Sequence, residues 1–224
     1  MVIYRSQMVA HHNRANWARI ASRELAAEVA GLEDCMRRGQ EMEWAANDDP
    51  EAYDAALSDA RLQAAERKER LITDAVIHGA AAIEGAFHGL AVAALGEDAA
   101  RRLSGMNGAA RKWSQLVEDV WGVNLPPNGA PLRSVGELFR SRNWLMHPNV
   151  VDVNTGRGVW EEVDVDGELM QTPVDLKDFT DLVDRKWDAA ERCALAIEAT
   201  FTELASCIDG YDATAGIAFE LLPR

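Results

Sequence analysis

The sequence predicts a mainly α-helical bundle with a small β-hairpin or three-strand insertion before the last long helix. Apolar residues recur every three to four positions over most of the chain, which is the period of one helix face. The period changes to two between about residues 150 and 174, which is typical of strands. A hydrophobic fraction of 48% beside 27% charged residues is close to the globular average, so we expect residues 1–224 to form a single domain.

The first two helical regions are predicted from periodicity and from their end signals. Residues 13–38 are expected to be helical and to end at Gly39, within an N-terminal helical extension of about residues 1–48. Pro50 follows two aspartates and opens helical sequence that continues to about Leu95. Gly79 is the candidate break between two helices in that stretch, because glycine is a poor helix former.

The middle of the chain is predicted to form short helices separated by glycine-rich turns. Gly96 and the stretch 104–108 bound a short helix, and another is expected over residues 109–121. A loop at 124–131 follows. The strands are expected in the insertion at about 150–174, where Asn and Gly residues supply turn signals.

Two further helices are predicted on either side of the insertion. Ser134 and Glu137 have the spacing of a capping box that opens a helix over residues 135–146, and Pro148 ends it. From Asp175 to about Ile208 the helical period returns without a proline or glycine inside it, so one long helix is expected.

The sequence favours a cytoplasmic location. The first residues lack the apolar stretch of a signal peptide, and no segment offers about 18 uninterrupted apolar residues. Cys35, Cys193 and Cys207 form neither a close pair nor a disulfide framework, so we expect reduced thiols. On one shared helix, Cys193 and Cys207 would lie about 21 Å apart.

The net charge of −14 disfavours a general nucleic-acid binder, because phosphate contacts need clustered lysine and arginine. Residues 101–148 nevertheless carry seven basic and three acidic side chains, a local charge of +4 that leaves −18 elsewhere. This segment is either an ordinary solvated surface or a local basic site. Its basic residues are Arg101, Arg102, Arg111, Lys112, Arg133, Arg140 and Arg142.

The segment Arg142-Asn143-Trp144-Leu145-Met146-His147 has the clearest chemistry. Five residues along an ideal helix differ by about 140° in direction, so Arg142 and His147 would not share a helix face. Pro148 disfavours the α conformation at His147, which lets that residue leave the helix and approach Arg142. A guanidinium binds phosphate through paired hydrogen bonds, and an imidazole transfers protons near neutral pH. The pair suits RNA cleavage by attack of the ribose 2′-hydroxyl on the adjacent phosphate, which needs no metal.

The same segment resembles the motif of the HEPN family, in which an arginine is followed by a polar residue, a few further residues and a histidine. The stretch 80–87, which includes Glu84, is similar to the long early helix of such proteins, where small residues and an acidic side chain pack near the motif. The resemblance covers about residues 71–201 and implies a HEPN-like helical bundle. The first 50 residues and the strand-like insertion depart from it.

The resemblance implies a homodimer in which two motifs face one another, and metal-independent endoribonuclease activity like that of toxins and phage-defence proteins in the family. By position, Arg142 would bind the phosphate, and His147 would act as acid or base. Asn143 would orient one of them or bind RNA, while Glu84 and Arg140 are secondary candidates. The implied partners are RNA, a second copy of the chain and a protein antitoxin or regulator, with no cofactor, metal or membrane.

These residues also have ordinary structural interpretations. Arg142 can be a surface cation and His147 a C-terminal helix cap. Glu84 and His88, four residues apart, can form a helix-surface pair. Trp144 is expected to pack in the core or in a dimer interface rather than to stack on bases. The chain would then be a non-catalytic HEPN-like module that binds a nucleotide or a protein.

Overall fold

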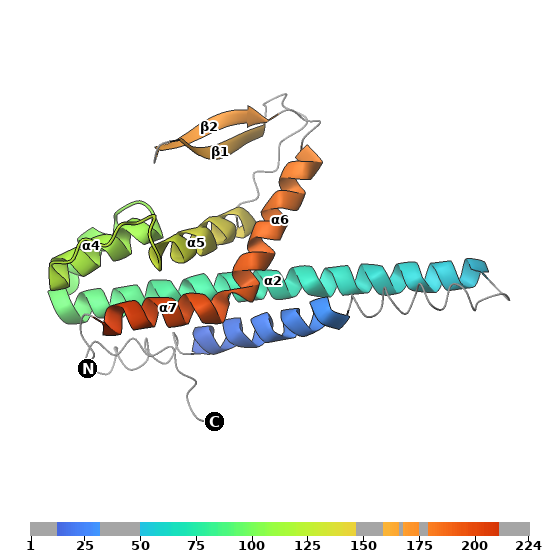
Figure 1. Ribbon diagram of the computed structural model, residues 1–224, viewed down its shortest axis with the longest axis horizontal. Helices are drawn as coiled ribbons and strands as arrows, with labels where there is room; N and C mark the ends of the chain where they lie inside the picture. The colour runs from blue at the N-terminus through green and yellow to red at the C-terminus, as the bar shows by residue number, and fades with distance from the viewer. Residues whose placement is uncertain (1–12, 32–49, 147–158, 166–167, 175–178, 211–224) are drawn as a thin grey trace.

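The computed structural model describes residues 13–31, 50–146, 159–165, 168–174 and 179–210, and these are mainly helical (Figure 1). The prediction of a mainly α-helical protein is therefore confirmed. Residues 13–31 are helical throughout and are called the N-terminal helix below; its predicted end at Gly39 lies outside the described residues. The elements that follow are α2 (Pro50–Leu95), α3 (Glu97–Ser104), α4 (Ala109–Trp121), α5 (Leu132–Met146), β1 (Val159–Val165), β2 (Glu168–Val174), α6 (Phe179–Leu195) and α7 (Ile197–Asp209).

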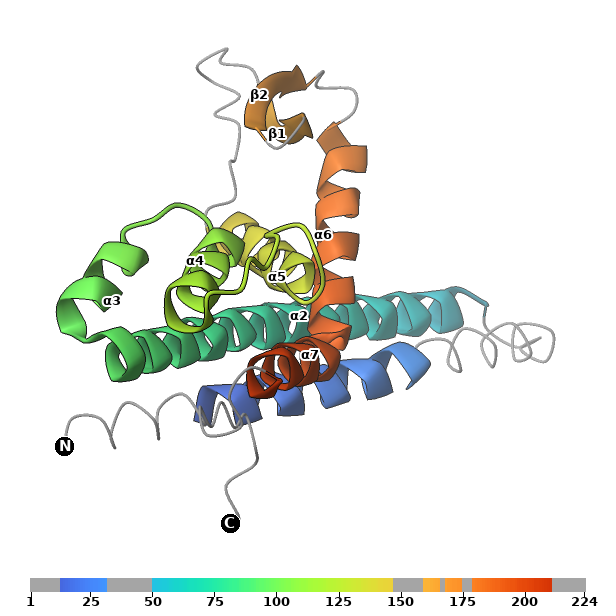
Figure 2. The same cartoon turned by 60° about the vertical axis from the view of Figure 1, so that its left-hand side comes forward.

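Helix α2 is the axis of the fold. Its 46 residues correspond to about 69 Å of helix, and it packs against each of α3, α4, α5, α6 and α7. Figures 1 and 2 show the N-terminal helix along one side of α2, with α4 and α5 on the other side. One hydrophobic core follows from this arrangement, because it contains side chains from the N-terminal helix and from every helix from α2 to α7.

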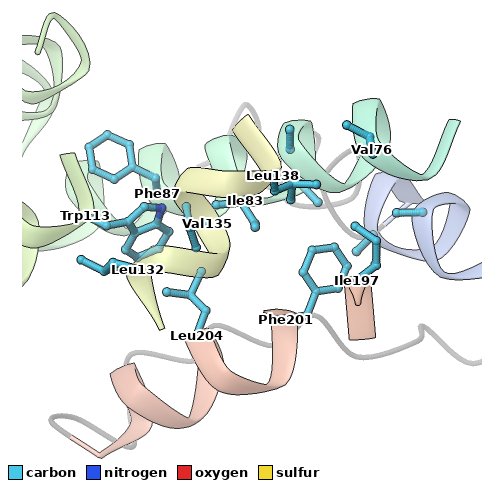
Figure 3. Close-up of a cluster of buried hydrophobic side chains, with 14 of the residues drawn as sticks. Val76, Ile83, Phe87, Trp113, Leu132, Val135, Leu138, Ile197, Phe201 and Leu204 are labelled. Carbon is cyan, nitrogen blue, oxygen red and sulfur yellow. The ribbon is translucent and has the colours of Figure 1, made fainter. Parts of the chain in front are cut away.

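The bulkiest core side chains gather where α2, α4, α5 and α7 meet (Figure 3). Trp113 of α4 packs edge-on against Phe87 of α2, with ring centroids 5.5 Å apart. Ile83 of α2, Leu132 of α5 and Phe201 of α7 are completely buried beside them. Burying a side chain of this size stabilises the fold by about 1.5–3 kcal/mol, so this cluster is the main source of cohesion between the four helices.

Gly79 does not divide α2, contrary to the sequence prediction, because the helix continues through it. A Cβ atom added to Gly79 would lie 2.5 Å from Cδ1 of Ile197 in α7 and 3.6 Å from Cδ2 of Leu138 in α5. The missing side chain therefore lets three helices approach one another at a single point. Glycine costs about 1 kcal/mol relative to alanine inside a helix, and the close packing offsets this cost.

Helix α5 begins at Leu132, three residues before the predicted start. Ser134 consequently lies inside the first turn, and the predicted capping box with Glu137 is wrong as the start of the helix. Leu132 and Val135 are both completely buried. Pro131, directly before Leu132, has its φ angle fixed at a value that suits a helix. Burial of Leu132 and the backbone preference of Pro131 together move the start of the helix toward the N-terminus.

The predicted last helix is divided at Ala196, which separates α6 from α7. Backbone hydrogen bonds continue across the bend, because the Ala196 N–H donates to the carbonyl of Arg192 and the Ala196 carbonyl accepts from Thr200. Figures 1 and 2 show α6 rising away from α2 while α7 runs along it. The bend allows Ile197 to enter the core completely.

The bend also separates the two cysteines of this region. Cys193 lies on α6 and Cys207 on α7, so the expectation that they share one helix is wrong. Both side chains are half-buried, and within the described residues neither forms a disulfide.

Strands β1 and β2 pair antiparallel, with Val159 opposite Val174 and Val165 opposite Glu168. Figures 1 and 2 show this pair beyond the N-terminal end of α6, at a distance from α2. The helices α5 and α6 that flank it in sequence pack directly against one another.

Among the described residues, Arg61–Leu95 is the one helical stretch that is long and apolar enough to cross a membrane by length and composition. Of its apolar window, 56% is buried inside the protein. The stretch belongs to α2, and its burial is consistent with the core helix of a soluble protein.

A paired ionic contact joins the N-terminal helix to α7. Arg19 is buried and donates from Nε and Nη2 to the two carboxylate oxygens of Glu198, at 2.5 and 3.0 Å. Its guanidinium also lies over the ring of Phe201, 5.4 Å from the centroid. Paired hydrogen bonds between charged groups are stronger than neutral ones, so this contact fixes the N-terminal helix on the bundle.

Replacing Gly79 by alanine is expected to destabilise the protein, although alanine is the better helix former. Overpacking against Ile197 costs about 1–3 kcal/mol, whereas the gain in helix propensity is about 1 kcal/mol. We expect a net loss of up to about 2 kcal/mol, measured as a lower denaturant midpoint. Gly89→Ala is the matched control, because no atom lies within 4 Å of its added Cβ. Ile197→Val removes Cδ1 and should recover part of the loss; equal stability of Gly79→Ala and Gly89→Ala would contradict the close packing.

Replacing Glu198 by glutamine is expected to destabilise the protein by about 1–2 kcal/mol, because it removes the carboxylate charge that pairs with the buried Arg19 guanidinium. Glu203→Gln, an exposed change on the same helix, is the control and should have little effect. Chemical denaturation measures both. A second readout is limited proteolysis, in which the N-terminal helix should be cut faster only in Glu198→Gln. Equal behaviour of the two variants would show that the ion pair does not hold this helix.

Candidate functional site

Arg142 lies four residues before the end of α5, and its side chain extends toward α2. Its Nη2 atom is 3.8 Å from Oε2 of Glu84 on α2. Its Nη1 atom donates a 3.1 Å hydrogen bond to Oδ1 of the neighbouring Asn143. The guanidinium also lies over the ring of Phe139, one helical turn earlier, at 5.9 Å from the centroid. Three different groups therefore orient this one guanidinium.

The Glu84 contact is weak enough to be exchanged for another anion. The Arg142 side chain is 36% exposed and that of Glu84 is 53% exposed, and 3.8 Å is longer than a charge-assisted hydrogen bond. Ion pairs of this kind contribute about 0.2–1 kcal/mol. A phosphate bound through two short hydrogen bonds to Arg142 is a better ligand. The arrangement thus presents an oriented cation at the protein surface.

The structure brings together three of the predicted site residues, namely Arg142, Asn143 and Glu84. Arg140 is exposed, and it leaves α5 in a direction about 200° from that of Arg142. It therefore does not join this cluster. His147 lies outside the described residues; it follows Met146, the last residue of α5. The approach of His147 to Arg142 stays a prediction.

The other side of α5 packs against α6. Ser141 is buried and donates a 3.5 Å hydrogen bond to Sγ of Cys193. Trp144 is half-buried and meets Trp187 edge-on, with ring centroids 5.3 Å apart and an interplanar angle of 90°. These contacts fix the rotation of α5 about its own axis. Trp144 thus packs within its own chain, and its predicted place at a dimer interface stays a prediction.

Burial raises the pKa of the Cys193 thiol, although the hydrogen bond from Ser141 acts in the opposite direction. The thiol therefore stays protonated at neutral pH, and a protonated thiol is a poor nucleophile. Cys193 therefore acts as a small packing group on the side of α6 that faces α5.

The basic residues of the positive segment are divided among α3, α4 and α5. A Cβ added to Gly136 of α5 would lie 3.7 Å from Cβ of Ala110 in α4, which identifies the side of α5 that faces α4. Arg133 and Arg140 are exposed and lie three residues before and four residues after Gly136, on the same stripe. These two arginines therefore flank the contact between α4 and α5, on a different side from Arg142.

Phe139 and Ser141 were not among the predicted site residues. Phe139 lies three residues before Arg142, and side chains at that spacing meet on a helix, so the sequence did contain a signal for this contact. The Ser141 contact with Cys193 spans 52 residues and has no such local signal. In the part of the chain that the structure describes, no group of three His, Cys, Asp or Glu residues is placed to hold a metal ion.

Alkylation of Cys193 should require a higher pH than alkylation of an exposed thiol, because its raised pKa keeps the thiolate scarce. Ser141→Ala removes the hydrogen bond that is the largest of the influences lowering this pKa and should shift the profile further upward. The folded state holds the thiol proton more tightly than the unfolded chain, so stability should fall as the pH rises above the ordinary thiol pKa. Iodoacetamide labelling followed by peptide mass spectrometry measures the profile. A profile equal to that of N-acetylcysteine would contradict the assigned environment.

In comparisons with known proteins, no family model, no curated protein and no solved structure matches the chain.

Proposed function

We propose that this protein is a HEPN-type endoribonuclease that cleaves RNA without a metal ion, through attack of the ribose 2′-hydroxyl on the adjacent phosphate. The observation that carries the proposal is the orientation of Arg142 by Glu84, Asn143 and Phe139, immediately before the segment that contains His147. An oriented guanidinium stabilises the negative charge that a phosphate gains in the transition state. It loses little side-chain freedom at that step, because Asn143 and Phe139 of the same helix already hold it.

The proposed roles follow from the chemistry of each side chain. Arg142 binds the scissile phosphate, and His147 transfers a proton as acid or base. Asn143 orients Arg142, because its amide oxygen accepts the hydrogen bond from Nη1. A single histidine cannot easily serve as base and acid on opposite sides of one phosphate. The proposal therefore includes a homodimer in which each chain contributes Arg142 and His147 to one HEPN-like site.

The proposed biological setting is a cytoplasmic toxin or phage-defence effector that acts on RNA and is controlled by a protein antitoxin or regulator. A positive segment within an otherwise acidic chain gives RNA one place to dock.

A non-catalytic HEPN-like module that binds a nucleotide or a protein is the second candidate. The net charge of −14 and the pairing of Arg142 with Glu84 favour it, because both oppose the approach of a polyanion. Such a module would retain the Arg142 cluster for binding and would leave RNA intact.

The full chain, purified and incubated in EDTA with a labelled single-stranded RNA, should yield fragments that end in 2′,3′-cyclic phosphate. Arg142→Ala and His147→Ala should each slow cleavage at least about 100-fold. Arg70→Ala removes the same charge from an exposed position on α2, outside the positive segment, and should leave the rate within about twofold. The RNA with 2′-O-methyl groups should not be cut. Full activity in His147→Ala would exclude the proposed mechanism and favour the binding module.

A further inference from the structure

The Arg142 cluster consists of Arg142, Asn143 and Phe139 of α5 together with Glu84 of α2. The backbone that carries Glu84 is held in place by the core. The flanking α2 residues Ile83 and Phe87 are buried in the core, so the backbone at Glu84 cannot move without disturbing that core. The side chain itself is about half exposed and has three rotatable bonds. The carboxylate can therefore rotate away from Arg142 while the helix that carries it stays in place.

The Glu84 carboxylate occupies the side of the guanidinium that a phosphate would use. Carboxylate and phosphate oxygens accept hydrogen bonds from the same planar set of N–H donors. Nη1 is directed to Asn143 within α5, whereas Nη2 faces Glu84. A phosphate that takes a donor pair including Nη2 must displace Glu84, because two anions at that position repel one another.

We propose that Glu84 is a displaceable counter-ion that occupies Arg142 in the free protein and is replaced by an RNA phosphate on binding. The inference rests on the proposed function only in naming RNA as the anion. Glu84 lowers the affinity of the site for every anion, and a single phosphate gains no other contact to offset this loss. An RNA strand carries many phosphates, so contacts of its other phosphates with the protein can offset it. Glu84 thereby selects a phosphate chain over isolated anions.

The test uses the full chain and a fluorescein-labelled 2′-O-methyl RNA, which cannot be cleaved because its 2′-oxygens are blocked. Glu84→Gln should tighten the dissociation constant about two- to fivefold, as expected from the loss of a competing exposed ion pair. Glu137→Gln is the matched control, since it removes one exposed carboxylate from α5 about 140° from the direction of Arg142. Glu137→Gln should change the dissociation constant by less than half as much as Glu84→Gln does.

A double-mutant cycle with Arg142→Ala isolates the part of the Glu84 effect that depends on its interaction with Arg142. In the Arg142→Ala background, Glu84→Gln should change the dissociation constant no more than Glu137→Gln does, because the cation for which Glu84 competes is absent. Melting temperatures of the single variants should lie within about 4 °C of that of the unchanged protein, which shows that binding changes do not come from unfolding.

Weaker or unchanged binding by Glu84→Gln would overturn the inference, as would an equal gain in both backgrounds or the absence of any binding. The outcome is separate from that of the cleavage assay. Cleavage together with unchanged binding by Glu84→Gln would refute the displaceable counter-ion and leave the ribonuclease intact. Tighter binding without cleavage by any form would support the counter-ion on a binding module.

Discussion

The contact between Gly79 and Ile197 determines how closely the central helices pack. The absence of a side chain at Gly79 leaves room for Ile197 of α7 against α2, and Leu138 of α5 meets the same point. Leu138 and Arg142 are one turn apart on α5, so they share a helix stripe. The contact that buries Leu138 therefore also directs Arg142 toward α2, where Glu84 lies. The geometry of the candidate site is therefore a consequence of how α2, α5 and α7 pack in the core.

Helix α5 is held from two sides, and this explains why its last turns can present an oriented side chain. Leu138 packs toward α2, whereas Ser141 and Trp144 contact Cys193 and Trp187 of α6. A helix supported on one side only can rotate about its axis by small amounts. Support on both sides removes this freedom, which is the condition for a binding site whose geometry exists before the ligand arrives.

Sequence reasoning predicted the helices whose ends carry local signals. Pro50 and Gly96 delimit α2, and α4 follows Gly108 with the bounds that were expected. The prediction at Gly79 was wrong, because helix propensity was considered without the contact to Ile197 that makes glycine necessary. The bend at Ala196 has no proline or glycine to mark it, and the burial of Ile197 against Gly79 of α2, directly after the bend, is a long-range contact without a local signal.

The contacts of the candidate site also differ in whether local sequence signals predict them. Arg142 and Asn143 are neighbours in sequence, so their interaction was accessible to local reasoning. The pairing of Arg142 with Glu84 joins residues on two helices, and only the resemblance to the HEPN family suggested it. Periodicity places Glu84 on the surface of α2 but cannot specify which helix lies opposite. The relation of His147 to Arg142 depends on residues beyond the end of α5, which the structure does not describe.

Strands β1 and β2 lie in sequence between α5 and α6, which pack against one another. The strand pair therefore belongs to a connection between two helices that are in contact. Doubling the length of such a loop costs only about 0.6 kcal/mol in closure entropy. Insertions and deletions there leave the packing of α5 on α6 almost unaffected. Evolution can therefore change the length and sequence of this connection at little expense to folding.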